Sequence, residues 1–326
     1  MTIGDLIRLM SDGDFHSGEQ LGERLGVSRT AVWKQLKKLE ALGIPLEAVK
    51  GLGYRLGEPV ELLDGGEIVS RLDAGSRPAL RRLFIEEALD STNAFLRNRF
   101  AQGAGHGEVC LAESQGAGRG RRGRSWVSPW GRGLLLSLGW RFENGVAALE
   151  GLSLAVGVVL AEVLEQEGAR VALKWPNDVL LDGEQGWQKL AGILLEVQGD
   201  LEGPCEVVIG IGLNVFLPEV LRDVIDQPAA AVADQVPGVS RNALAAGLIG
   251  GLLELMQRFE GEGFGAWQAA WNARHAHAEQ EVEVIQGSSS YRGIALGVDG
   301  AGHLEVRCGG ELRRLAGGEI SVRGRR

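Results

Sequence analysis

The chain has 326 residues, a length that predicts two or three domains, because a single hydrophobic core rarely grows beyond about 250–300 residues. Hydrophobic residues make up 44% of it, yet no run of about 18 apolar residues interrupts the pattern, which argues against a membrane span. The net charge of −9 would by itself argue against a nucleic-acid partner, but the charge is unevenly distributed.

The N-terminus and the cysteines indicate a cytoplasmic protein. Residues 1–15 lack the basic stretch followed by an apolar one that a secretory signal requires. Cys110, Cys205 and Cys308 lie far apart in the chain and show no paired spacing, as expected of reduced thiols.

Residue patterning divides the chain into three regions and predicts an α+β multidomain protein. Residues 1–58 have the pattern of three short helices and a hairpin, and residues 64–275 alternate helical and strand patterns, as a mixed α/β domain does. Residues 276–326 contain short strands separated by turns, which predicts a small β-barrel. Gly57-Glu58-Pro59 marks the first boundary and residues 275–279 mark the second.

The first region carries the signals of a helix-turn-helix. Ser17 and Gln20 match a capping box, and Gly26 is a stop signal for the helix that they open. Ser28 can cap a second helix after a tight Gly-Val-Ser turn. Its apolar positions recur at three- and four-residue spacing and should face the core: Val32, Leu36 and Leu39. Residues 46–56 then alternate around two glycines, as a β-hairpin wing does.

The outward face of the second helix is basic and predicts DNA binding. Residues 28–55 carry six basic and two acidic side chains, whereas residues 1–27 carry two basic and five acidic ones. The alternative is a small helical domain with a solvated basic face, but turn, basic helix and wing together favour DNA. The residues predicted to contact DNA are Ser28, Arg29, Thr30, Trp33, Lys34, Lys37 and Lys38, although Trp33 could instead pack on the wing.

Residues 118–124, Gly-Arg-Gly-Arg-Arg-Gly-Arg, form the densest chemical signal of the second region. Glycines allow a backbone to wrap closely around a ligand, and arginines supply fixed positive charge for phosphate. The spacing matches neither a P-loop nor a dinucleotide-binding turn that opens a helix. Such a stretch alone is also compatible with a disordered basic loop or a nucleic-acid arm.

Three further residues have two interpretations each. Trp126 could stack on a base or belong to the core, and Lys189 could pair with an anion or extend its stem along a surface. Asn214 ends an apolar strand, where it could bind a ligand or cap a turn. Residues 134–138 predict a buried strand, and residues 145–168 predict a long helix.

The order of the motifs resembles that of the biotin protein ligases. The matching motifs are Asp90-Ser-Thr-Asn93, Gln115, Gly118-Arg-Gly-Arg-Arg-Gly123, Lys174-Trp-Pro-Asn-Asp178, Lys189-Leu-Ala-Gly-Ile193 and Gly210-Ile-Gly-Leu-Asn214. With the N-terminal region and Gly317-Gly-Glu-Ile-Ser321, the resemblance covers almost the whole chain and extends to the bifunctional type that also represses the biotin operon.

This resemblance implies a winged helix-turn-helix at residues 1–58, a roughly seven-stranded mixed sheet backed by helices at 64–275, and an SH3-like barrel at 276–326. The implied enzyme is a biotin–[acetyl-CoA-carboxylase] ligase that makes biotinyl-5′-AMP from biotin and ATP with Mg²⁺. Its partners would be the biotin carboxyl carrier protein, whose lysine receives biotin, and operator DNA. The adenylate would act as corepressor and favour a homodimer.

The resemblance also implies roles for individual residues. Biotin would contact Ser91, Thr92, Asn93, Gln115, Arg119, Gly120, Arg121 and Lys189. ATP and the adenylate would contact Gly118, Arg119, Arg121, Trp126, Asn177, Lys189, Asn214 and Arg323. Lys189, Arg119 and Arg121 would be catalytic, and Asp178 would hold Mg²⁺.

Two alternatives stay open, and one segment departs from the family pattern. The chain could be a lipoate or octanoate ligase-type acyl transferase on the same scaffold, or a non-catalytic repressor that senses biotin. Residues 179–188 form a longer segment than the family usually carries, and Asp182-Gly183 within it predicts the turn of a hairpin.

Overall fold

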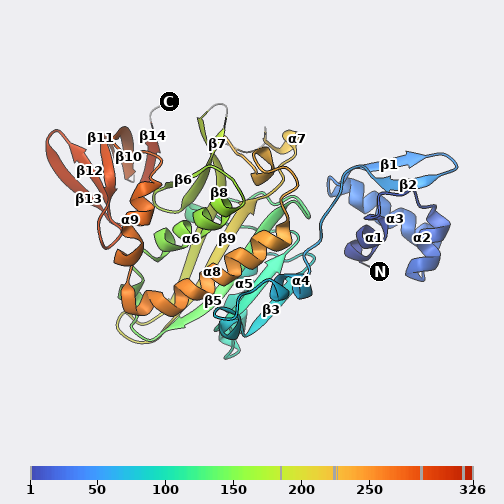
Figure 1. The fold of residues 1–326 in the computed structure, drawn as a ribbon, viewed down its shortest axis with the longest axis horizontal. Helices are drawn as coiled ribbons and strands as arrows, with labels where there is room; N and C mark the ends of the chain where they lie inside the picture. The colour runs from blue at the N-terminus through green and yellow to red at the C-terminus, as the bar shows by residue number, and fades with distance from the viewer. Residues whose placement is uncertain are drawn as a thin grey trace.

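The structure is a computed structural model that describes residues 2–183, 186–222, 225, 227–286, 289–317 and 320–324. The side chains of residue 220 and of residues 320–324 lie outside the described part. The elements follow the three predicted regions, with the winged region at one end of the molecule and the C-terminal strands at the other (Figure 1).

The N-terminal region is the predicted winged helix-turn-helix. Its elements are α1 (Ile3–Met10), α2 (Gly18–Leu25), α3 (Arg29–Ala41) and the hairpin of β1 (Leu46–Val49) and β2 (Gly53–Leu56). Ser17 caps α2 in a capping box with Gln20, and Gly26 ends it in the left-handed conformation. The stripe of Val32, Leu36 and Leu39 is buried in the small core, as its spacing predicted.

A seven-stranded mixed sheet forms the centre of the molecule, in the order β3-β4-β5-β9-β8-β7-β6. Neighbours pair antiparallel except for β3 and β4, which are parallel. The strands are β3 (Arg82–Glu86), β4 (Glu108–Ala112), β5 (Gly133–Phe142), β6 (Val171–Lys174), β7 (Asp178–Gly183), β8 (Gly186–Gly199) and β9 (Cys205–Asn214).

Helices cover both faces of this sheet. On one face lie α6 (Leu152–Gln166) and α8 (Arg241–Glu262), which cross the strands side by side (Figure 1). On the other face α5 (Thr92–Ala101) packs on β4, β5 and β9 and leaves the glycine-rich half of β8 and β9 for the site. The remaining helices are α4 (Gly65–Ser70), α7 (Glu219–Arg222) and α9 (Gly265–Ala273), with short 3₁₀ turns at 77–79, 121–123, 146–149 and 232–234.

The segment Val146–Gln166 is long and apolar enough to cross a membrane by composition alone. Its apolar character has a different cause here, because most of α6 is buried between the sheet and α8. The predicted single helix over residues 145–168 is also divided, since Gly151 adopts the left-handed conformation before α6 begins.

The C-terminal region is all strand, as predicted. It forms a five-stranded antiparallel sheet in the order β13-β12-β11-β10-β14. The strands are β10 (Gln280–Gln286), β11 (Ser289–Val298), β12 (Leu304–Cys308), β13 (Glu311–Leu315) and β14 (Ile320–Gly324). The indole of Trp175 donates to the carbonyl of Gly302, which joins this sheet to the central region.

The predicted turn at Asp182-Gly183 is wrong. Asp182 pairs with Trp187 and Gly183 with Gly186, so both residues belong to β7 and not to a turn. Strand pairing along the whole hairpin outweighs the local turn preference of this dipeptide.

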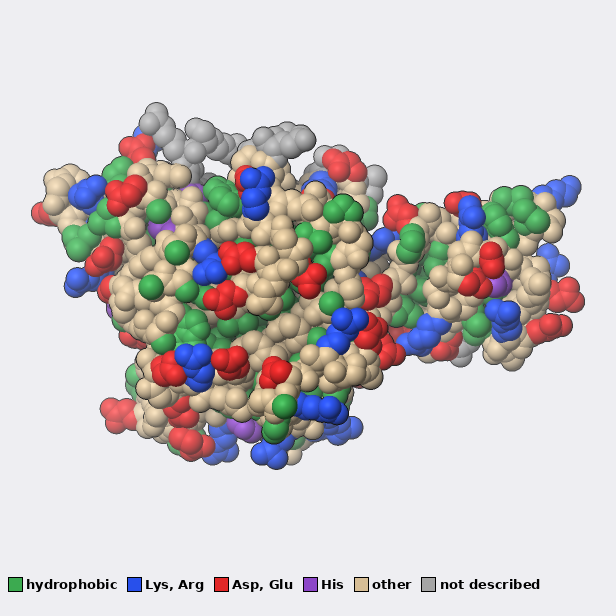
Figure 2. Space-filling view, in the orientation of Figure 1, with side chains coloured by type: hydrophobic (Ala, Val, Ile, Leu, Met, Phe, Trp, Pro, Cys, Tyr) green, Lys and Arg blue, Asp and Glu red, His purple; other side chains and the backbone are tan. Residues whose placement is uncertain are grey.

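The winged region forms a lobe that stands apart from the main body and meets it over a small area (Figure 2). Several contacts between described residues join the two parts. The amide of Gly4 donates to Glu87, Arg132 forms an ion pair with Glu58 at 2.8 Å, and Trp130 is buried in the hydrophobic cluster of the winged region.

Candidate functional site

A buried polar cluster lies where α5 begins on the open face of the sheet. The Thr92 amide and hydroxyl both donate to Oε1 of Gln115, at 2.7 and 3.0 Å. Ser137 on β5 donates to Thr92 at 2.7 Å and lies 2.6 Å from Oδ1 of Asn93. The Ser91 hydroxyl caps α5 by accepting from Ala94. The structure therefore brings together four of the eight residues predicted to contact biotin, Ser91, Thr92, Asn93 and Gln115, and adds Ser137.

Glu196 on β8 links this cluster to the glycine–arginine loop. Its carboxylate accepts from Nδ2 of Asn93 at 2.9 Å and pairs with Arg119 at 3.2 Å and Arg97 at 3.4 Å. A side chain at Gly210 would clash with this arrangement, because a Cβ there would lie 2.2 Å from Oδ1 of Asn93. Arg119 thus lies beside the polar cluster, next to Glu196.

The loop at residues 118–126 folds back on itself as a tight hairpin. The Gly120 amide donates to the Arg124 carbonyl at 2.7 Å, and the Trp126 amide donates to the Gly118 carbonyl at 2.9 Å. Arg122 at its tip has a φ of 60°, the left-handed conformation that costs energy for a residue with a Cβ. The loop is therefore ordered by its own backbone.

The indole of Trp126 lies close to two glycines of the sheet, Gly192 and Gly212. A Cβ at Gly212 would lie 2.5 Å from the ring, and one at Gly192 would lie 3.3 Å from it. Only strands without side chains at these positions allow the ring to approach the backbone so closely. Trp126 is therefore a half-buried residue lying over the sheet rather than part of the hydrophobic core.

Lys189 lies beside this indole and is paired with Asp178. Its ammonium is 5.7 Å from the centroid of the Trp126 ring and 2.8 Å from the Asp178 carboxylate, and both charged side chains are 17% exposed. Arg121 donates to Oδ1 of Asn177 at 3.3 Å, and burial lowers the pKa of its guanidinium. Asn177 also donates to the Ile193 carbonyl at 2.8 Å.

Asn214, at the end of β9, is linked to Lys189 through the backbone of Ala230. Its Nδ2 donates to the Ala230 carbonyl at 3.1 Å, and the Ala230 amide in turn donates to the Lys189 carbonyl at 2.9 Å. The predicted nucleotide residue Arg323 belongs to β14 by its backbone, but its side chain lies outside the described residues.

Sequence reasoning missed Ser137 and Glu196. Ser137 follows a run of leucines that predicted a buried strand, and nothing local marks its hydroxyl as functional. Glu196 is the last residue of the Lys189–Glu196 stretch, and strand alternation places it on the same face as Gly192 and Leu194. That alternation was a signal that could have found it.

Asp178 is an isolated carboxylate in this site. Among the described residues no group of three or more histidine, cysteine, aspartate or glutamate side chains could hold a metal by itself. Asp178 does fit Mg²⁺, which proteins commonly hold through one or two carboxylates together with substrate phosphates and water.

The predicted DNA-contacting residues share one exposed surface. All seven side chains of α3 and its cap in that prediction are exposed, and Trp33 is 51% exposed rather than packed under the wing. Lys37 pairs with Glu40 at 2.7 Å on the same helix. The wing adds the exposed Leu52 at its tip.

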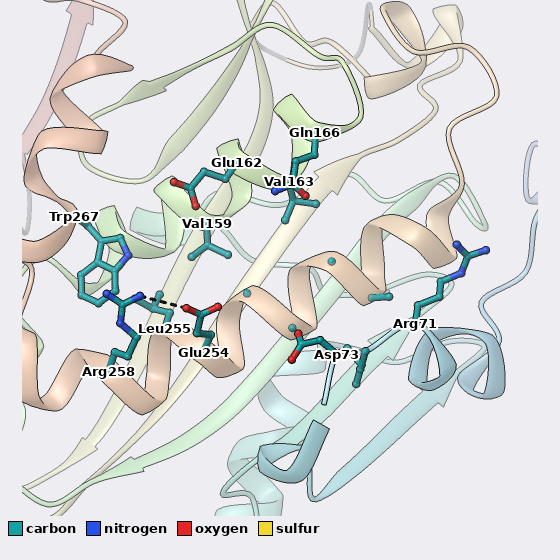
Figure 3. Close-up of a pocket in the computed structure, with 15 residues that line it drawn as sticks. Arg71, Asp73, Val159, Glu162, Val163, Gln166, Glu254, Leu255, Arg258 and Trp267 are labelled. Carbon is teal, nitrogen blue, oxygen red and sulfur yellow. Dashed lines mark hydrogen bonds and ion pairs between the residues drawn. The ribbon is translucent and has the colours of Figure 1, made fainter. Parts of the chain in front are cut away.

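A cavity of about 340 Å³ lies away from the site, between α6 and α8 and beside Trp267 (Figure 3). Within its wall Arg258 pairs with Glu254 at 3.2 Å, and Arg71 pairs with Glu67 of α4 at 2.7 Å. Val159 of α6 packs where a Cβ on Gly251 would lie, 2.7 Å away, so close helix packing accounts for the glycines of its wall. It opens on the opposite side of the sheet from Lys189.

Family models match three segments of the chain. The biotin/lipoate A/B protein ligase family matches residues 86–214, a helix-turn-helix domain matches residues 5–55, and the biotin protein ligase C-terminal domain matches residues 277–323.

Whole-chain relatives agree with this division. The chain is 43% identical to a bifunctional ligase/repressor BirA of Salmonella typhimurium over 98% of its own length and 96% of the relative's. It is 35% identical to a biotin–[acetyl-CoA-carboxylase] ligase of Mycobacterium tuberculosis over 76% of its own length and 91% of the relative's. Among solved structures, the biotin protein ligase from Aquifex aeolicus in complex with biotin and ATP superposes with a TM-score of 0.63 at 26% identity, covering 75% of this chain and all of that one. The chain therefore belongs to the biotin protein ligases of the bifunctional ligase/repressor type.

Proposed function

We propose that the site around Lys189 joins biotin to ATP, forming biotinyl-5′-AMP and releasing pyrophosphate. The observation that carries this proposal is the ammonium of Lys189, which lies beside the Trp126 indole and pairs with Asp178 at 2.8 Å. When the carboxylate of biotin attacks the α-phosphorus, negative charge develops on the phosphate oxygens. Lys189 and Arg121 are positioned to neutralise it, and no protein nucleophile is required.

The polar cluster of Ser91, Thr92, Asn93, Gln115 and Ser137 is suited to the ring of biotin. The ureido group carries both N–H donors and a carbonyl acceptor, and such groups need hydrogen-bonding partners when they are buried. The cluster offers hydroxyls and amides that serve as either donor or acceptor, arranged around one end of the glycine path on β8 and β9. Arg119 would then shield the ring from solvent through its pair with Glu196.

The nucleotide is proposed to lie at the other end of the path. Trp126 provides a flat surface for the adenine or for the chain of biotin, and Asn177, Asn214 and Gly118 line the same region. Mg²⁺ would be held by Asp178 and by phosphate oxygens, and it supplies charge neutralisation when bound. Lys189 would leave Asp178 for the phosphate as ligand and metal enter.

The second half of the reaction is a transfer from the adenylate to a lysine amine of the biotin carboxyl carrier protein. The mixed anhydride is sensitive to water, so the loop at residues 118–126 must cover it until the acceptor arrives. Gly118, Gly120 and Gly123 give this loop the freedom to approach the ligand closely. An enzyme that uses ATP is expected in the cytoplasm. The free thiols of Cys110, Cys205 and Cys308 fit the same compartment, because its reducing conditions keep cysteines unpaired.

Pyrophosphate release tests the ligase proposal directly. The purified chain is incubated with ATP and Mg²⁺ and with biotin or lipoate, and an apo carrier protein is added to measure transfer. Release that depends on biotin but not on lipoate is the expected result. Release with lipoate alone would identify an acyl transferase of the lipoate type. Tight biotin binding with neither release nor transfer would identify a repressor that senses biotin without catalysis.

The winged region is proposed to bind operator DNA as one half of a symmetric dimer. The exposed cations of α3 supply the attraction to phosphate, and a two-fold dimer would place two such helices on an inverted repeat. Biotinyl-5′-AMP would favour the dimer and so act as corepressor. Sedimentation of the full chain, with and without biotin and ATP, checks the dimer: a species that stays monomeric with adenylate bound would refute it.

A further inference from the structure

Arg241 at the start of α8 is fully buried and contacts three separate segments. Its guanidinium pairs with the Glu113 carboxylate at 2.7 Å and donates to the Gly133 carbonyl from Nε at 3.0 Å and from Nη2 at 2.8 Å. Nη1 donates to the Glu61 carbonyl at 2.6 Å. A buried charge with this many partners fixes the segments that it contacts, because moving one segment alone would leave buried charges unpaired.

Two of these segments are the ends of the loop that carries the ligand-site arginines. Glu113 follows β4, and Gly133 begins β5. The Gly131 amide also donates to the Glu113 carbonyl at 3.0 Å. One guanidinium therefore holds both ends of the loop at residues 114–132.

The third segment is the linker from the winged region to the central sheet, residues 57–64. The Leu63 amide donates to the Glu113 carboxylate at 2.8 Å, and the Asp64 amide donates to Oδ1 of Asn242 at 2.8 Å. Nδ2 of Asn242 donates back to the Leu62 carbonyl at 2.9 Å. The linker thus finds its backbone partners in the same residues that hold the loop. We call Glu61, Glu113, Arg241 and Asn242 the Arg241 cluster.

The loop itself also reaches the winged region. Trp126 lies on Gly212 in the ligand site, and four residues later Trp130, 4% exposed, is buried in the hydrophobic cluster of the winged region with Val60. A Cβ at Gly131 would lie 3.1 Å from Val60, so backbone and linker are in contact there. A short stretch of chain therefore has one end in the ligand site and the other in the winged region.

We propose that Arg241 is a positioning residue that couples closure of the loop over its ligand to the conformation of the winged-region linker. The proposal rests on the proposed function, in which the loop at residues 118–126 covers the adenylate. Closure of the loop constrains its ends at Glu113 and Gly133, and the Arg241 cluster passes this constraint to Leu63 and Asp64. Coupling of this kind is reciprocal, so the linker must also influence ligand affinity.

Hydrogen exchange of the full chain tests the proposal. Exchange of the Leu63 and Asp64 amides is compared with and without biotin, ATP and Mg²⁺, and exchange of residues 114–128 is followed in the same samples. We expect the two linker amides to exchange about fivefold more slowly, or slower still, with ligand. Protection of the loop with unchanged linker amides would overturn the coupling alone. No loop protection and no pyrophosphate release would overturn the proposed function and the coupling with it.

Variants separate coupling from simple stabilisation. Arg241→Lys keeps the charge but loses the planar guanidinium that reaches three segments at once, and should abolish the ligand-dependent change in linker exchange. Since this variant could fold poorly, Glu61→Gln provides a milder test, because the Glu61 carboxylate accepts from Ser240 at 2.6 Å and from the Arg241 amide.

The matched control is Glu67→Gln, which makes the same charge change just after the linker, on α4, at an exposed ion pair with Arg71. We expect Glu61→Gln to reduce the ratio of linker exchange rates without and with ligand and to raise KM for biotin several-fold, whereas Glu67→Gln changes both less than about twofold. A ratio like that of the unaltered chain in both Arg241→Lys and Glu61→Gln would refute the role of Arg241. A purely structural residue would alter overall stability without altering this ratio.

Discussion

The two regions that use positive charge do so in opposite ways. On α3 the cations Arg29, Lys34 and Lys38 are exposed to solvent. In the central site Lys189 and Arg121 are partly buried, and each contacts a neighbouring side chain, Asp178 and Asn177 respectively. Exposed cations act additively on a polyanion and are screened by salt. A buried cation stabilises developing charge because it is held at one position, so replacing it abolishes that stabilisation rather than weakening it slightly.

Loss of the buried lysine should give the largest effect. Lys189→Ala removes the ammonium proposed to stabilise the charge developing on the α-phosphate, and we expect adenylate formation to fall by about 10²–10³-fold or more. Pyrophosphate release measures the rate, and the circular-dichroism melting curve checks that the fold is intact. A normal rate in a folded variant would remove the proposed role of Lys189 and the contrast with α3.

A buried histidine outside the site should give the next largest effect, on stability. Burial, helped by the nearby His277, lowers the pKa of His275 to about 4, while its ring stacks on Trp271 at 4.8 Å. The unfolded chain takes up this proton near pH 6.5 and the folded chain only near pH 4, so stability is lost as the pH falls through this window. The loss is about 3 kcal/mol at most.

Urea unfolding at pH 7 and pH 4.5 measures this dependence. His275→Gln should flatten it, because the variant has no proton to take up at this position. An equal pH dependence in the two proteins would contradict the assignment to His275.

The glycines under Trp126 should give graded effects on nucleotide binding. Gly212→Ala places a Cβ 2.5 Å from the indole and must displace it, whereas Gly192→Ala places one at 3.3 Å, which a small shift can relieve. We expect KM for ATP to rise about tenfold for Gly212→Ala and clearly less for Gly192→Ala. Steady-state kinetics at saturating biotin give both values. Equal values for the two variants would contradict contact between the ring and Gly212 as the cause.

Single exposed cations on α3 should give the smallest effect. Lys34→Ala should lower operator affinity a few-fold and reduce the slope of log affinity against log salt by about one. Arg8→Ala on α1 is the matched control, since it removes an exposed cation outside α3. Pyrophosphate release should be unchanged in both variants. A loss of affinity as large for Arg8→Ala would place the DNA-binding surface elsewhere.

Local signals made the winged region predictable. The caps at Ser17 and Gly26 and the stripe of Val32, Leu36 and Leu39 depend on residues within a few positions of one another, and all were confirmed. The families and the overall order of elements were also confirmed.

Contacts between distant segments could not be predicted in the same way. Ser137 meets Thr92 only because β5 and the start of α5 pack together, and Glu113 meets Arg241 across 128 positions. The turn assigned to Asp182-Gly183 was wrong for a related reason, since pairing with β8 decides where β7 ends. The types of residue in the motifs were enough to predict the kind of chemistry. The contacts that each residue makes could not be predicted, because they depend on strand register and on packing between distant segments.

A gel-shift titration of the full chain on its own biotin-gene promoter tests the central claim most directly, because it joins the buried site to the exposed one. The unaltered chain should shift the DNA at lower concentration with biotin, ATP and Mg²⁺ than without them, while Lys189→Ala should shift it at the same concentration in both conditions. A shift of the unaltered chain that does not depend on ligand, or no shift at all, would contradict an account in which adenylate formation at Lys189 controls DNA binding by α3.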